Sequence, residues 1–209
     1  MEEFVFARYE KLMPRIIKEL ESRNITGYYA KDSKKALEIA LSLIPEGSTV
    51  THGGTMSARA IGLMDALSNG NYNFVSRDNN PNKEEVYLKA FSSDVYISST
   101  NAITEDGILV NIDGTGNRTA AIIYGPKKVI FIVGRNKITD DVDGALKRAR
   151  NVAAPINAQR FDAQTACSKT GSCGDCKSPD NICCEFVFTR YSREPGRMHV
   201  ILVNEDLGF

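Results

Sequence analysis

The chain has 209 residues, and its 26 lysines and arginines balance its 26 aspartates and glutamates, so the formal net charge at neutral pH is zero. A balanced chain without a basic stripe gives no electrostatic reason to expect a nucleic-acid partner. No apolar run approaches the roughly 20 residues that a membrane span needs.

The first part of the chain alternates predicted helices and short strands. Apolar residues at helical spacing predict a helix over residues 3 to 22, in which Pro14 either bends the helix or starts a new one. Ser33 is a candidate N-cap for a second helix, which Pro45-Glu46-Gly47 ends. A short strand, Thr49-Val50-Thr51, follows.

This strand runs into a glycine turn that precedes a third predicted helix. A strand, two glycines and hydroxyls at a helix start are typical of an anion cradle, because first-turn amides lack internal partners. Alternatively, the turn needs glycine for its backbone angles, with a hydroxyl as helix cap. Both interpretations stay open, and the candidate ligand-binding residues are His52, Gly53, Gly54, Thr55 and Ser57.

Further along, the same alternation continues. We predict a strand over residues 72 to 75, a helix opened by Asn80 and Pro81, a strand over residues 94 to 98 and a helix over residues 140 to 150. Between the last two lies Val129-Ile130-Phe131-Ile132-Val133, bounded by Gly125-Pro126 and Gly134. Such an unbroken apolar run is typical of a parallel strand that is buried on both faces.

Residues 98 to 118 hold an unusual density of small, amide and acidic residues. An Asp106-Gly107 turn predicts an inserted antiparallel hairpin, which leads into a glycine-rich loop. Amides, a carboxylate and a guanidinium in such a loop can orient a polar ligand, although single members also satisfy loop backbone. These candidates are Asn111, Asp113, Gly114, Gly116, Asn117 and Arg118.

Glu105 is the candidate catalytic residue. If its hairpin turn faces the turn at residues 52 to 57, a carboxylate lies beside an anion cradle, as nucleophilic or acid–base chemistry requires. The alternative is that Asp-Gly simply forms a common two-residue hairpin turn. We expect the two turns to converge at one rim of the sheet.

All five cysteines lie between residues 167 and 184, in the spacing Cys167-x5-Cys173-x2-Cys176-x6-Cys183-Cys184. Clustered cysteines agree with a reducing, cytoplasmic location, because a disulfide framework would join distant segments. Two thiolates two residues apart can bind one metal, and outer cysteines can complete four sulfur ligands. We predict zinc or an iron–sulfur cluster at Cys167, Cys173, Cys176 and Cys183, with a thiol–disulfide pair as the alternative.

The end of the chain changes character. Residues 155 to 184 lack periodicity and predict an irregular loop, and residues 186 to 191 and 198 to 203 are predicted to form a C-terminal β-hairpin. We therefore expect an α/β core over residues 1–154, with residues 155–209 packed on the same domain as the cysteine loop and hairpin. The alternation of helices and strands favours a three-layer α/β/α sandwich with an inserted antiparallel hairpin.

Several motifs resemble the lactate-utilisation (LUD) domain family over nearly the whole chain. They are His52-Gly53-Gly54-Thr55, the run from Thr100 through Glu105-Asp106-Gly107 to Arg118, Gly125-Pro126-Lys127, Gly134-Arg135-Asn136-Lys137 and Glu205-Asp206-Leu207-Gly208. The resemblance implies a fold of the NagB/RpiA/CoA transferase-like type and a role in oxidising lactate alongside iron–sulfur partner subunits. Asn101, Thr104, Asn136 and Lys137 belong to these motifs and join the ligand-binding candidates.

Three functional classes follow. The first is a redox-linked protein of lactate or related hydroxy-acid metabolism, with a four-cysteine cluster and a pocket for a small anionic substrate or effector. The second is a CoA- or acyl-transferase-like enzyme that uses Glu105, with structural zinc. The third is a non-catalytic accessory subunit, and homo-oligomerisation is compatible with all three.

Overall fold

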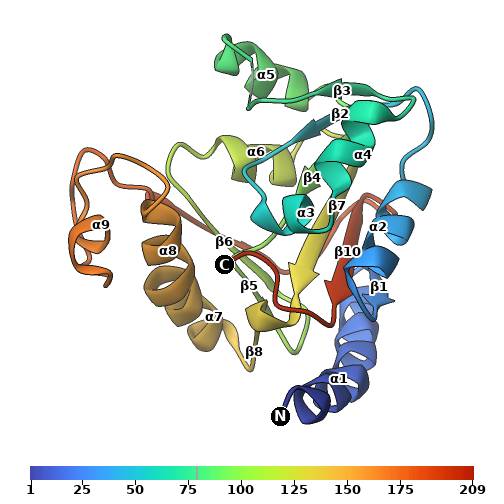
Figure 1. Cartoon of the computed structure of the whole chain (residues 1–209), viewed down its shortest axis with the longest axis horizontal. Coiled ribbons are helices and arrows are strands. Elements are labelled where there is room, and N and C mark those ends of the chain that lie inside the picture. The colour runs from blue at the N-terminus through green and yellow to red at the C-terminus, as the bar shows by residue number, and fades with distance from the viewer. Residues whose placement is uncertain (79) are drawn as a thin grey trace.

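The centre of the molecule is a sheet of six strands, and every neighbouring pair in it is parallel. The computed structural model describes residues 1–78 and 80–209 (Figure 1). In spatial order the strands are β1 (Thr26–Ala30), β10 (Met198–Val203), β7 (Lys128–Gly134), β4 (Val95–Ser98), β2 (Thr49–His52) and β3 (Asn73–Val75).

Strand β7 confirms the prediction of a strand buried on both faces. Val129, Phe131 and Val133 join one hydrophobic cluster, whereas Ile130 and Ile132 join the cluster on the opposite face. Because side chains alternate along a strand, an unbroken apolar run supplies both cores at once.

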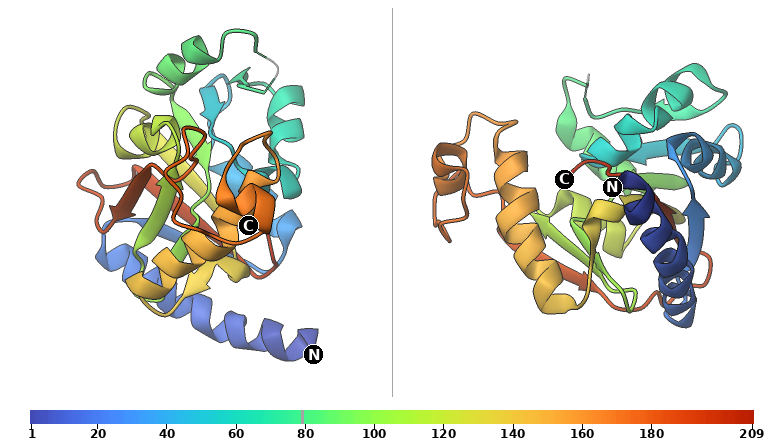
Figure 2. Two further views of the ribbon diagram at one scale, coloured as in Figure 1. Left: turned by 90° about the vertical axis from the view of Figure 1, so that its left-hand side faces the viewer. Right: turned by 60° about the horizontal axis from the view of Figure 1, so that its bottom comes forward.

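Helices cover both faces of this sheet, as Figures 1 and 2 show. One face packs against α1 (Glu2–Ser22) and α6 (Asn117–Ile123), and the other against α2 (Ser33–Ser42), α3 (Met56–Ala60) and α4 (Leu63–Asn69). The three-layer α/β arrangement is therefore confirmed. Helix α1 is continuous through Pro14, which lies on its exposed side, and Asp32, not Ser33, caps α2. No helix in the described part of the chain combines the length and apolar character of a membrane span.

A smaller sheet lies beside the first. Its order is β8 (Ile138–Thr139), β5 (Ala102–Thr104), β6 (Leu109–Asp113) and β9 (Glu185–Thr189), and β5 and β6 form the predicted antiparallel hairpin. The remaining helices are α5 (Lys83–Ala90), the 3-10 turn Arg135–Lys137, α7 (Val142–Arg148), a π-helical segment (Ala149–Ala153), α8 (Ala154–Ala158) and α9 (Ala166–Thr170).

The predicted C-terminal hairpin is wrong. Strand β9 pairs with β6, whereas β10 lies inside the main sheet, between the edge strand β1 and β7. All six residues of β10 are buried. Burial on both faces between two parallel neighbours stabilises this apolar strand more than pairing with the half-exposed β9 would. Helix α6 was not predicted: residues 113 to 118 were assigned to a loop, and residues 103 to 124 as a whole to the inserted hairpin.

Because the main-sheet strands are parallel, their carboxyl ends all lie at the same end of the sheet. After β2 the chain continues to β3 on one side of it, whereas after β4 it continues to β7 on the opposite side. This reversal between β2 and β4 opens a crevice, the place where open α/β sheets bind ligands.

Gly134 terminates β7 at this end of the sheet and leaves no room for a side chain. A Cβ at this position would lie 2.5 Å from the Leu207 nitrogen and 2.8 Å from the Glu205 oxygen. We expect Gly134→Ala to lower the free energy of unfolding by about 1–3 kcal/mol, since backbone must shift to relieve the overlap. Urea unfolding checks this. Gly54→Ala is the control, because its nearest atom would be 3.7 Å away, and equal losses in both variants would contradict the prediction.

Candidate functional site

A cavity of about 470 Å³ lies at the carboxyl ends of β2, β4 and β7. We call it the anion pocket, after the kind of ligand that is proposed for it below. Gly54, Thr55 and Met56 enter it from the turn after β2, and Ser99 to Asn101 from the segment after β4. Its volume is in the range of pockets that bury a small-molecule ligand.

Positive charge exceeds negative charge around this pocket. Five cationic side chains and two carboxylates line it: Arg59, Arg77, Arg118, Arg160 and Lys137 against Asp78 and Asp113. Arg118 and Asp113 face each other at 3.9 Å and largely neutralise one another. The excess therefore comes from the other members, and Arg59, Arg77 and Arg160 are named the arginine triad below.

Within the described residues, Arg59 is the one member of the arginine triad that forms an ion pair, and its partner is Asp78. Arg77 lies over the Tyr87 ring with 5.4 Å to its centroid, and Arg160 lies 5.6 Å from the centroid of Phe161. Partial desolvation lowers the pKa of Arg160, and the nearby charges of Arg59 and Arg77 lower it further. Guanidinium groups that repel one another in a cavity favour the binding of an anion between them.

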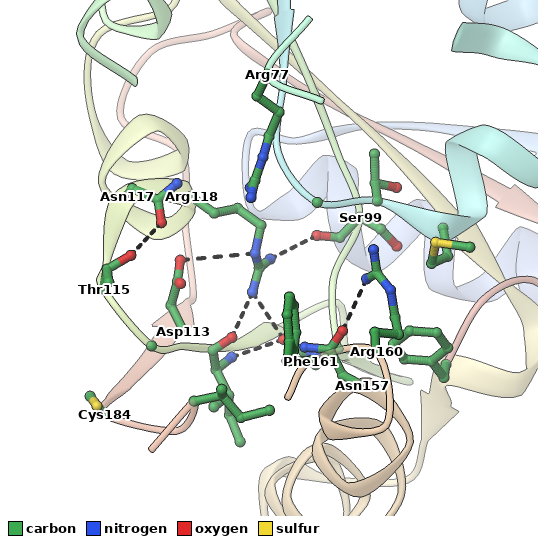
Figure 3. Close-up of a pocket in the computed structure, with 18 of the residues that line it drawn as sticks. Arg77, Ser99, Asp113, Thr115, Asn117, Arg118, Asn157, Arg160, Phe161 and Cys184 are labelled. Carbon is green, nitrogen blue, oxygen red and sulfur yellow. Dashed lines mark hydrogen bonds and ion pairs between the residues drawn. The ribbon is translucent and has the colours of Figure 1, made fainter. Parts of the chain in front are cut away.

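Arg118 has a different role, which Figure 3 shows. Its guanidinium donates to the Ser99 oxygen at 3.2 Å, Asn111 Oδ1 at 2.6 Å, Asn101 Oδ1 at 3.1 Å and the Ile112 oxygen at 2.7 Å. Its donors are thus largely used by the protein. Arg118 fixes the two segments that form the pocket floor, and Gly53 makes room for it, since a Cβ there would lie 2.9 Å from its Cγ.

Lys137 is the most unusual ionisable group in the pocket lining. Its side chain is 3% exposed, and its Nζ donates to Ser99 Oγ at 3.1 Å and to the Thr100 oxygen at 3.2 Å, with no carboxylate among the described residues paired to it. Burial, and then the charges of Arg148 and Arg118, lower the pKa of Lys137 from 10.5 to about 7. At neutral pH a substantial fraction of this amine is therefore uncharged and able to accept a proton.

The structure brings about half of the predicted ligand-binding residues to the anion pocket. Those that line it are Gly54, Thr55, Asn101, Asp113, Gly114, Asn117, Arg118 and Lys137. Those that do not line it are His52, Gly53, Ser57, Thr104, Asn111, Gly116 and Asn136. Most members of the second group shape the backbone around the pocket: Gly116, for example, begins α6 at a φ of 74°.

His52 lies behind the glycine turn. Its Nδ1 is 2.8 Å from the Gly53 oxygen and its Nε2 is 3.0 Å from Ser76 Oγ, and its ring stacks on Phe74. Burial lowers its pKa, which favours the neutral form of the ring. These contacts use His52 to hold the turn in place. Thr55 caps α3, as the alternative interpretation of the turn expected.

The expected convergence of the turns near residues 53 and 105 is not observed. Arg23 holds the Asp106 carboxylate at 2.6 Å, and Gly107 packs against the backbone of Leu20 at the end of α1. Glu105 is not among the residues that line the anion pocket. The opposite end of the hairpin, around Asn101 and Asp113, meets the glycine turn instead, because β5 and β6 point their turn away from the sheet edge.

Four cysteines line a second cavity of about 70 Å³, named the cysteine cavity: Cys167, Cys173, Cys176 and Cys183. These are the four predicted metal ligands. Burial raises the pKa of Cys183 to about 11, and the other three thiols raise it as well, which reflects their proximity. Within residues 1–78 and 80–209, no group of three or more His, Cys, Asp and Glu side chains is arranged to hold a metal ion. The donor set fits a thiolate centre, and the sulfurs must move inward to form one.

None of the three arginines of the triad was among the candidates named from the sequence. Arg77 follows the end of β3 by two residues, so a basic residue at the carboxyl edge of the sheet was a readable signal. Arg59 lies one helical turn after Thr55 and was also within reach. Arg160 gave no signal, because it follows α8, and its position depends on how the helical segment of α7 and α8 packs beside the smaller sheet (Figure 1).

Comparisons with known proteins bear on the whole chain. A sequence model of the LUD domain matches residues 13–203. Among solved structures, a DUF162 family protein from Deinococcus radiodurans is similar over 93% of this chain and 97% of its own, with a TM-score of 0.55 and 11% identity, which shows a shared fold. eIF2B delta from Chaetomium thermophilum is 20% identical over 62% of this chain and 57% of its own, with a TM-score of 0.36. No curated protein matches the chain.

Proposed function

Because this chain belongs to the LUD domain family, we propose that it binds an anionic hydroxy acid or oxo acid in the anion pocket, in the utilisation of lactate or a related acid. The arginine triad carries this proposal. Guanidinium groups bind carboxylates through paired hydrogen bonds, and among the described residues only Arg59 of the three has a carboxylate partner, Asp78. The pocket volume also admits related acids larger than lactate.

Lys137 is proposed to supply proton transfer to such a ligand. The two electrons that a hydroxy acid loses on becoming an oxo acid would have to pass to a separate electron acceptor. An α-hydroxy acid carries a hydroxyl next to its carboxylate, and its oxo acid carries a carbonyl there. A buried amine with a pKa of about 7 can take a proton from the hydroxyl or return one to the carbonyl oxygen. Lys137 is therefore proposed to exchange a proton with the ligand while the arginine triad holds its carboxylate.

The cysteine cavity is proposed to hold zinc or an iron–sulfur cluster. Cys167, Cys173, Cys176 and Cys183 would be the ligands. A cluster would supply electron transfer and link the chain to iron–sulfur partner subunits, whereas zinc would stabilise a loop that has little apolar core. The supporting observation is that four thiols, one from α9 and three from the segment that follows it, line one cavity.

Calorimetric titration tests the proposed function. We expect lactate and pyruvate to bind, and lactamide, which has the same shape without the charge, to bind at least about tenfold more weakly. The affinity of pyruvate should also fall as salt is added, because part of the attraction comes from solvent-facing charges. Equal binding of lactate and lactamide, or no binding of either acid, would contradict the proposal.

A further inference from the structure

The anion pocket and the cysteine cavity share a wall. Asn181 and Ile182 line both cavities. The two residues that follow them separate: Cys183 lines the cysteine cavity, whereas Cys184 lines the anion pocket, at whose rim Figure 3 shows its side chain. We call residues 181–184 the shared wall.

Hydrogen bonds tie the shared wall to both sides. Toward the cysteine cavity, Asn181 Nδ2 donates to the Cys176 oxygen at 3.3 Å. Toward the anion pocket, the Cys184 amide donates to the Asp113 oxygen at 2.9 Å, and Gly114 packs so closely that a Cβ there would lie 3.3 Å from Ile182 Cα. A displacement of the wall on one side therefore reaches residues that line the other.

The continuous helical segment formed by α7, the π-helical turn and α8 is a second connection between the two cavities. Arg150 lies 2.5 Å from the Asp175 carboxylate and 3.7 Å from Cys173 Sγ, next to the cysteine cavity. About two helical turns after Arg150, Asn157 of α8 lines the anion pocket. Arg160, just past the end of α8, lines it as well. The charge of Arg150 is also placed to offset the negative charge that four thiolates would bring.

We propose that a metal centre held by Cys167, Cys173, Cys176 and Cys183 fixes the shared wall and thereby strengthens anion binding. Each thiol releases its proton to solvent when it binds the metal. Drawing the sulfurs together moves Cys183, and the rest of the shared wall moves with it. If the metal has already ordered the shared wall, less conformational entropy is lost when the anion binds. Metal binding and anion binding are therefore coupled. The coupling to anion affinity rests on the proposed function.

Cys184 is excluded from this centre. It lies on the pocket side of the shared wall, and its Sγ is 3.3 Å from the Asn181 oxygen. Cys183 and Cys184 therefore form a matched pair, in which the same chemical change is made at neighbouring positions on opposite sides of one wall.

The test uses the full chain purified without oxygen. The metal is measured by elemental analysis, removed with a chelator and a reductant, and restored with Zn²⁺ alone or with iron and sulfide. We expect one of the two to bind with four-thiolate spectral character, to slow hydrogen exchange of residues 181–184 by about tenfold, and to tighten pyruvate binding by about tenfold.

The two cysteine variants separate the proposal from a general effect of lost thiols. Cys183→Ser should lose the bound metal together with the slowed exchange and the tighter binding. Cys184→Ser should keep the bound metal and the slowed exchange. Because Cys184 lines the anion pocket, its pyruvate affinity is compared only with that of its own metal-free form, and the gain on restoring metal should persist. Equal metal loss in both variants, or exchange and pyruvate affinity that are the same with and without metal, would overturn the inference. Slowed exchange without pyruvate binding in either form would instead overturn the proposed function and leave the metal-fixed wall in place.

Discussion

Replacing Arg77 and Arg160 together by glutamine is expected to weaken pyruvate binding by about a hundredfold. A hydrogen bond to a charged group contributes about 1.5–3 kcal/mol, and the lower end applies here because Arg160 is solvent-exposed. Each single variant should therefore lose about tenfold. Glutamine keeps some hydrogen-bonding capacity on a shorter side chain and removes the charge, so the loss reports on the charged guanidinium group as a whole. Titration calorimetry of the two single variants and the double variant measures it.

Arg8→Gln is the matched control for this set. Arg8 lies over the Tyr9 ring, 5.0 Å from its centroid, much as Arg77 lies over Tyr87, but it is on α1 and does not line the anion pocket. We expect its pyruvate affinity and its unfolding free energy to stay close to those of the unchanged chain. If the double variant and Arg8→Gln bind pyruvate equally well, the arginine triad is not the anion site.

Replacing Lys137 by methionine is expected to stabilise the protein at pH 7 and to remove its proton-transfer chemistry. The pKa of Lys137 is about 7 in the folded chain and 10.5 as its ordinary value. Between these pH values the unfolded chain binds the proton more readily than the folded chain, so the stability of the unchanged protein rises with pH across this window. Below about pH 7 the full penalty applies, on the order of a few kcal/mol.

Methionine carries no proton in either state. The gain in unfolding free energy should therefore be largest at pH 7 and below, and should shrink toward pH 10.5, where the hydrogen bonds lost to Ser99 and Thr100 oppose it. Urea unfolding at pH 7 and pH 10 measures the difference. Lys11→Met, at an exposed position on α1, should show no such dependence. A Lys137→Met variant that loses stability equally at both pH values would show that Lys137 is charged and paired in the folded protein.

The residues in these two predictions differ in how well the sequence alone pointed to them. Lys137 belongs to a motif and was a ligand-binding candidate from the start, whereas neither Arg77 nor Arg160 was named. Local motifs identify residues that follow strands, because such residues share a short stretch of chain with the turn that they form. Arg77 follows β3 and could have been found in this way. Arg160 reaches the pocket from the segment after α8, far along the chain, and leaves no such pattern.

Glu105, in contrast, was named as a candidate catalytic residue but does not line the anion pocket. Its Asp106-Gly107 turn was read correctly as the turn of an antiparallel hairpin. The direction in which the hairpin points was not readable, and the structure packs the turn against the end of α1, with Arg23 bound to Asp106. A turn's conformation depends on its own residues, but its neighbours depend on the packing of the whole hairpin.

The sequence by itself determined the α/β class, the doubly buried strand β7 and the cysteine spacing, because each depends on residues that are close along the chain. Tertiary structure alone decided that β10 lies inside the main sheet between β1 and β7, that three arginines line one pocket, and that Cys183 and Cys184 face different cavities. The physical reason is common to all three. Burial and charge act between segments far apart in sequence, and their energies are fixed only when the layers pack together.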